Sequence, residues 1–119
     1  MNVNGLIKKI GESMGYEVAQ DLYHGTSPKN ITFTYEDEVP GAFADNAAQT
    51  ETAYIMVSMN TPERYAYMKD KESLKRALQK SDFNVTSIRS WLEGEQKGIE
   101  RTRRTVFSVN ITQPVQEEK

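Results

Sequence analysis

The first apolar residues of the chain recur at the spacing of an amphipathic helix. Counting from residue 3, positions i, i+3, i+4, i+7 and i+11 are apolar, and they are Val3, Leu6, Ile7, Ile10 and Met14. Gly15 follows this stripe and predicts that the helix ends in a left-handed conformation. Gly5 and Gly11 weaken the helix by up to about 1 kcal/mol each, so we expect it to depend on tertiary packing.

Alternation of apolar and polar residues predicts strands over much of the remaining chain. Ile31, Phe33 and Tyr35 alternate with threonines, which is the period of a half-buried strand. A second alternating set consists of Ala53, Ile55, Val57 and Met59. A shorter strand is expected within residues 16–23, before a turn at 24–28, and two further strands at 85–92 and 102–112. Glycines between these last two strands predict a hairpin.

A second helix is predicted at residues 62–80, where Tyr67, Leu74, Ala77 and Leu78 form the apolar stripe. Thr61 and Pro62 are typical of a helix start, and Asp70 offers a second one. The order helix, three strands, helix, two strands favours an α+β fold with a mixed, mostly antiparallel sheet of about five strands and two helices on one face. We expect a shared core of Leu6, Ile10, Phe33, Ile55, Val57, Leu74, Leu78, Phe107 and Val109.

An acidic segment at residues 36–52 separates the second and third predicted strands. It contains five carboxylates and no basic residue, and Pro40 and Gly41 fit a turn. Read as a connection, it is about three times the usual length, and such connections tend to be functional or disordered. We therefore interpret it as a flexible loop, poorly ordered over residues 38–51, and as a contact surface.

The size and composition of the chain indicate one domain spanning residues 1–119, with residues 113–119 as a flexible tail. The sequence has no cysteine, which excludes disulfides, thiol catalysis and thiolate metal sites. It shows no secretory signal and no apolar run long enough for a membrane span. We expect a soluble intracellular protein without a membrane partner.

The sequence offers no motif for catalysis, metal binding or a cofactor. His24 is the sole histidine and has no companion at metal-ligand spacing. The acidic residues lack the spacing of a calcium loop. Arg101, Arg103 and Arg104 form the most basic run, but neighbouring glutamates dilute it and no aromatics interleave for base stacking. We interpret this run as a charged edge strand or a subunit contact, with no sequence-specific nucleic-acid partner.

Charge is distributed unevenly along the chain. Residues 36–51 carry −5, whereas residues 63–80 carry six bases and three acids, hence +3. Two such surfaces suit self-association, although a solvated loop and a solvated helix face explain them equally simply. Trp91 is interpreted either as a core residue or as an interface anchor. The candidate interface residues are Glu36, Asp37, Glu38, Asp45, Lys71, Lys75, Arg76, Trp91, Arg101 and Arg103.

Several runs resemble small neck and tail proteins encoded in prophages of Gram-positive bacteria. They are residues 33–46 (FTYEDEVPGAFADN), 52–58 (TAYIMVS), 83–87 (FNVTS) and 105–107 (TVF). With its element order, the chain resembles the tail-completion, or tail-terminator and head-to-tail joining, family of long-tailed bacteriophages over most of its length. The glycine-bearing first helix departs from some members of that family.

The resemblance implies a non-enzymatic virion protein that forms a ring, typically a hexamer, at the head-proximal end of the tail tube. Such a ring stops tube growth and joins the tail to the head, with DNA passing through its lumen. Its partners would be further copies of itself, the tail tube protein and the head connector, and it would assemble in the host cytoplasm. The alternatives are a small protein-binding accessory or regulatory protein of a prophage, and a small-molecule-binding domain.

Overall fold

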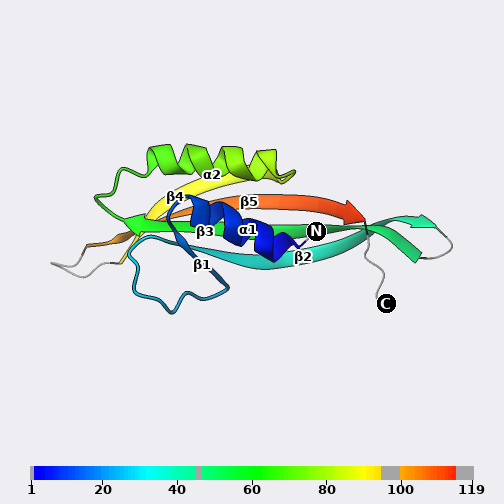
Figure 1. Cartoon of the computed structure of the whole chain (residues 1–119), viewed down its shortest axis with the longest axis horizontal. Coiled ribbons are helices and arrows are strands. Elements are labelled where there is room, and N and C mark those ends of the chain that lie inside the picture. The colour runs from blue at the N-terminus through cyan, green and yellow to red at the C-terminus, as the bar shows by residue number, and fades with distance from the viewer. Residues whose placement is uncertain (1, 45–46, 95–99, 115–119) are drawn as a thin grey trace.

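Two helices and a mixed five-stranded sheet make up the computed structural model, which describes residues 2–44, 47–94 and 100–114 (Figure 1). This confirms the predicted α+β fold and element order. The sheet order is β1-β2-β3-β5-β4; β1 and β2 pair in parallel, and the other neighbours pair antiparallel. The elements are α1 (Val3–Ser13), β1 (Glu17–Gln20), β2 (Asn30–Ala44), β3 (Ala47–Pro62), α2 (Met68–Lys80), β4 (Asn84–Glu93) and β5 (Thr102–Pro114).

One core lies between the sheet and both helices. Ile7 and Ile10 of α1 and Leu74 and Leu78 of α2 belong to the same buried cluster as the inward residues of β2, β3 and β5. The nine residues predicted to share a core all lie in or against this cluster, with Leu6 partly buried at its border. Burial at this scale, about 25 cal/mol per Å² of apolar surface, is the main stabilising contribution to such a fold. The core also contains residues that the predicted set left out, including Ile7, Tyr16, Ile31, Met59, Phe83 and Ile111.

The first helix begins and ends as its sequence predicts. The Asn2 side chain caps it by accepting a hydrogen bond from the Gly5 backbone N–H at 3.2 Å. Gly15 has φ +84°, the left-handed conformation expected just after the helix. Gly11 is buried where α1 crosses β1 and β2, so a residue that weakens the isolated helix allows its close packing on the sheet.

The prediction that the acidic segment is a loop is wrong. β2 continues to Ala44 and β3 begins at Ala47, so the segment forms two paired antiparallel strands. A register shift between Tyr35 and Asp37 leaves Glu36 as an extra residue, which is a β-bulge. Pro40 has no backbone N–H to donate. It is tolerated because, among the described residues, no strand pairs with this part of β2 on the side away from β3. Residues 38–44 and 47–51 are therefore strand and not loop, their expected flexibility stays a prediction, and Asp45 lies outside the described residues.

We call residues 36–44 and 47–54 the arm. It extends past α1 to one end of the molecule, whose principal extents are 61 × 26 × 24 Å (Figure 1). Among the described residues, β5 accompanies the arm as far as the pairing of Pro114 with Thr50, and beyond this point β2 and β3 pair with each other. The arm thus starts with three strands and continues with two.

Two predicted boundaries need correction. Thr61 and Pro62 do not start α2, because they still pair with β5 at the end of β3. The helix begins at Met68, with Asp70 in its first turn. The expected tail also starts later than residue 113, since Gln113 and Pro114 belong to β5; residues 115–119 lie outside the described residues. In each case cross-strand pairing extends a strand beyond its alternating pattern.

Candidate assembly surfaces

The acidic residues of the arm occupy both faces of the hairpin. Asp37 pairs with Tyr54, which faces away from the helices, whereas Glu38 pairs with Ala53, which packs against the core. Glu51, next to Ala53, lies close enough to Glu38 to share a hydrogen bond. That hydrogen bond, with smaller contributions from partial burial and the charges of Glu51 and Asp37, raises the pKa of Glu38 above its ordinary value. The arm therefore concentrates negative charge that lacks a basic partner among the described residues.

A shallow pocket of about 590 Å³ lies where the arm meets the start of α1. Tyr35 donates a hydrogen bond to the Asn4 Oδ1 atom at 2.5 Å and joins β2 to the helix there. Glu38 and Glu51 are its charged lining residues. Two carboxylates do not make a metal site, and the described residues contain no group of three or more His, Cys, Asp or Glu that could hold a metal ion.

The sheet face opposite the helices, which we call the uncovered face, has no helix over it within the described residues (Figure 1). Neighbouring residues on it form rows across four strands, and one row is Asn30, Asn60, Arg104 and Trp91. Trp91 is 39% exposed, so its interpretation as a core residue is wrong. It donates an indole hydrogen bond to Glu93 at 2.9 Å and remains available as an interface anchor.

The basic residues of α2 lie on a different part of the molecule. The helix contains Lys69, Lys71, Lys75, Arg76 and Lys80 against Asp70 and Glu72, hence +3. Arg76 forms an exposed ion pair with Glu72 at 3.5 Å, which reduces its availability to another subunit. Lys71 and Lys75 are half-buried and form no ion pair within the part of the chain that the structure describes.

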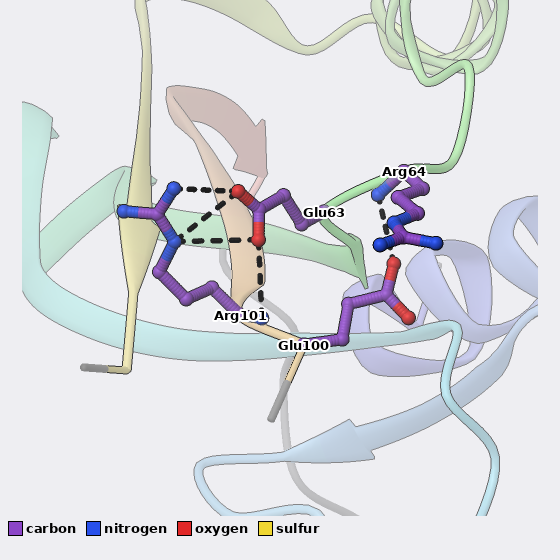
Figure 2. A network of polar contacts seen from close by, with 4 residues as sticks. All are labelled: Glu63, Arg64, Glu100 and Arg101. Atoms are coloured by element: carbon purple, nitrogen blue, oxygen red, sulfur yellow. Dashed lines mark hydrogen bonds and ion pairs between the residues drawn. The ribbon is translucent and has the colours of Figure 1, made fainter. Parts of the chain in front are cut away.

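Internal contacts occupy the arginines of the basic run. Arg101 forms a two-pronged ion pair with Glu63, and the Arg64 backbone N–H donates to Glu100 at 2.9 Å (Figure 2). The ion pair raises the pKa of Arg101 and lowers that of Glu63. These contacts tie the chain after β3 to the start of β5, so Arg101 serves the fold of its own protomer.

The other two arginines of this run also have partners within the protomer. The Arg103 guanidinium lies 4.6 Å from the centre of the Tyr67 ring, and Arg104 lies 3.3 Å from a Glu93 carboxylate oxygen. β5 runs between β3 and β4, so the interpretation of this segment as a charged edge strand is wrong. Arg101 and Arg104 are instead paired with glutamates of the same protomer, and Arg103 lies against an aromatic ring.

A polar cluster that the sequence did not reveal surrounds Asp70. One Asp70 carboxylate oxygen accepts hydrogen bonds from the Tyr16 and Tyr65 hydroxyls, both at 2.6 Å. The Lys29 ammonium lies 5.0 Å and 4.7 Å from the centres of the same two rings. These residues come from four separate segments and share no spacing motif, so only the folded chain brings them together.

The cluster shifts the protonation of its members in opposite directions. Burial raises the pKa of Asp70, but the hydrogen bonds from Tyr16 and Tyr65, together with Lys29 and Lys69, outweigh it and leave that pKa below its ordinary value. Burial and the hydrogen bond to Asp70 raise the pKa of Tyr16. Both shifts favour the neutral tyrosine beside the ionised carboxylate. The hydrogen bonds join the segments before β1 and before α2 to the first turn of α2, so we interpret the cluster as a structural tie.

His24 is exposed between β1 and β2. Neither helix of the described chain has the length and apolar content that a membrane span requires. A comparison with protein-family models found no match, and a comparison with curated protein sequences found none either.

Proposed function

We propose that the chain is a structural protein of a bacteriophage neck, which forms a ring at the head-proximal end of the tail, ends tail-tube growth and joins tail to head. The observation that carries the proposal is the arm. Past the pairing of Thr50 with Pro114 the described part of the arm has two strands, and an isolated two-stranded hairpin is at best marginally stable in water. A neighbouring subunit is the natural support for such an extension.

The distribution of charge favours assembly in a ring. A ring needs two different, complementary surfaces on each protomer, because each subunit contacts its two neighbours through different patches. The arm is acidic and α2 is basic, and they lie on separate parts of the molecule (Figure 1). Such surfaces attract between copies and cannot neutralise each other within one copy.

The arm has a second possible place in such a ring. If it lines the lumen, its carboxylates repel the DNA backbone and keep the passage free during ejection. A protein-binding accessory protein remains the alternative function, in which the uncovered face and the arm bind a different partner as monomer or dimer.

The mass of the assembly distinguishes these possibilities. Size-exclusion chromatography with light scattering, over a wide range of protein concentrations, should show a particle of six 13.6 kDa protomers, and negative-stain microscopy should show rings. Added to a polymerising tail tube protein from the same phage, the protein should shorten the tubes and sit at one end of each. A chain that stays monomeric at high concentration and beside its tube protein would contradict the ring and favour the accessory role.

A further inference from the structure

The two outer edges of the sheet differ in charge and in protection. On one side β1 pairs with β2 only from Asn30 to Phe33, so the edge of β2 is unpaired from Thr34 onward among the described residues. That edge carries a bulge at Glu36, three consecutive acids and Pro40. Charges, bulges and prolines are the devices by which natural edge strands avoid pairing with copies of themselves.

The opposite edge is formed by β4 and has fewer such devices. Its register shift lies near its start, between Val85 and Ser87, and the strand then pairs regularly with β5 up to Glu93. This stretch contains neither proline nor glycine. On the uncovered face it carries Arg89, opposite Val106, and Glu93, which forms an ion pair with Arg104 of the same copy. Unpaired backbone N–H and C=O groups along such an edge are satisfied best by another strand.

Charge argues against pairing of either edge with its own copy. Two β2 edges would bring their acids together, and two β4 edges would bring together Arg89 and the basic helix α2, which runs alongside β4 (Figure 1). An acidic edge against a basic edge is favoured instead. We propose that the free edge of β2 pairs with the β4 edge of a neighbouring copy, which extends one sheet from subunit to subunit.

The direction of the strands is compatible with this contact. β2, β3, β5 and β4 reverse direction at each step across the sheet, so β2 and β4 run in opposite directions. A second copy placed edge to edge in the same orientation therefore brings its β2 antiparallel to β4. Because the two edges are different surfaces, the contact is heterologous and repeats from copy to copy.

Side-chain orientation selects one register. Asp37 and Arg89 both lie on the uncovered face, so placing Asp37 of one copy opposite Arg89 of the next pairs opposite charges. In the same register the adjacent Glu38 lies on the helix side of the sheet, towards the lysines of α2. Only the last residues of β4, up to Glu93, then reach the part of β2 that is already paired with β1, and the rest of β4 faces the unpaired part of β2.

This inference rests on the proposed ring and names its subunit contact. The absence of native cysteines allows a direct test, because only introduced thiols can form disulfides. Facing residues in an antiparallel pair have the Cα separation that a disulfide requires, about 4.5–5.5 Å. The double variant Asp37→Cys/Arg89→Cys, oxidised and run on a non-reducing gel, should give a ladder of cross-linked oligomers. Each single-cysteine variant should give little beyond monomer, as should Asp37→Cys/Ser90→Cys, in which the second thiol points to the helix side.

A charge exchange provides an independent readout. Asp37→Arg and Arg89→Asp should each weaken assembly by about tenfold, since attraction becomes repulsion, and the double exchange should restore it. Glu12→Arg, an equal charge change on the exposed side of α1, should have little effect. A hexamer that forms without the ladder and without response to the exchange would overturn the edge contact and leave the ring. A ladder from open chains would support the contact and contradict the ring, and a monomer under all conditions would overturn both.

Discussion

Gly11 of α1 lies so close to Val18 of β1 that a β-carbon on the glycine would stand 2.4 Å from the Val18 Cγ2 atom. The same carbon would lie 3.1 Å from Cδ1 of Ile31. The position therefore sets the distance between the first helix and the sheet, and any side chain there would force them apart.

The first prediction follows from this contact. Gly11→Ala should lower the free energy of unfolding by about 1–3 kcal/mol, the usual cost of overpacking, even though alanine favours the helix. Gly5→Ala is the matched control, since its nearest neighbours would be the Asn2 side chain at 3.6 Å and beyond. It should stabilise the protein by up to about 1 kcal/mol. Urea denaturation of the two variants would contradict the close-packing argument if both gained stability equally.

Leu78 tests the position of the second helix. Its side chain is fully buried against the sheet, so Leu78→Ala should cost roughly 2–5 kcal/mol of stability. Exposed Gln79→Ala in the same turn should change stability by less than about 0.5 kcal/mol. A chemical melt in which Leu78→Ala matches that control would show that this face of α2 is not in the core.

The sequence predicted the parts of the fold that local periodicity determines. Ile55 and Val57 alternate with more exposed neighbours, and Leu74 and Leu78 are one helical turn apart. The strand, the helix and the burial of these four residues were therefore predicted correctly. The strands of the arm were not predicted, because Pro40, Gly41 and the acidic residues favour turns and loops, and pairing with β3 overrides these preferences.

The candidate surfaces were only partly predictable for the same physical reason. The charge of α2 is a property of composition and was visible in the sequence. Whether Arg101 is free or paired depends on Glu63, a residue far away in sequence, and the exposure of Trp91 depends on which strand forms the edge of the sheet. Non-local pairing decides these points, and no local pattern records it.

Asp70 should make stability depend on acid pH. Its pKa is lowered in the folded protein, so its contribution is fully present above the unfolded value of 3.8 and is lost as pH falls through the lower folded value. Asp70→Asn should therefore unfold more easily near neutral pH and lose less additional stability than the wild type in this acid range. Urea midpoints measured from pH 7 to pH 2 check this, and parallel curves for the two proteins would contradict it.

The arm should be protected at its base in solution. Amide hydrogens of residues 37–41 that pair with β3 should exchange with solvent more slowly than those of the connection between β1 and β2, where His24 is exposed. Hydrogen–deuterium exchange with mass spectrometry measures this directly. Equally fast exchange in both segments would show that the acidic segment opens readily in the free protomer.

The place of β5 in the sheet has a consequence for how the chain is made. β5 follows β3 and β4 in the chain, yet it lies between them in the sheet. Until it leaves the ribosome, β3 keeps an unpaired edge and β4 has no strand to join. The loop-closure cost of bringing β5 to β3 across the intervening helix and strand also slows folding. A chain that ends before β5 cannot complete the sheet, so such truncated products should be removed as unfolded protein before they can enter an assembly.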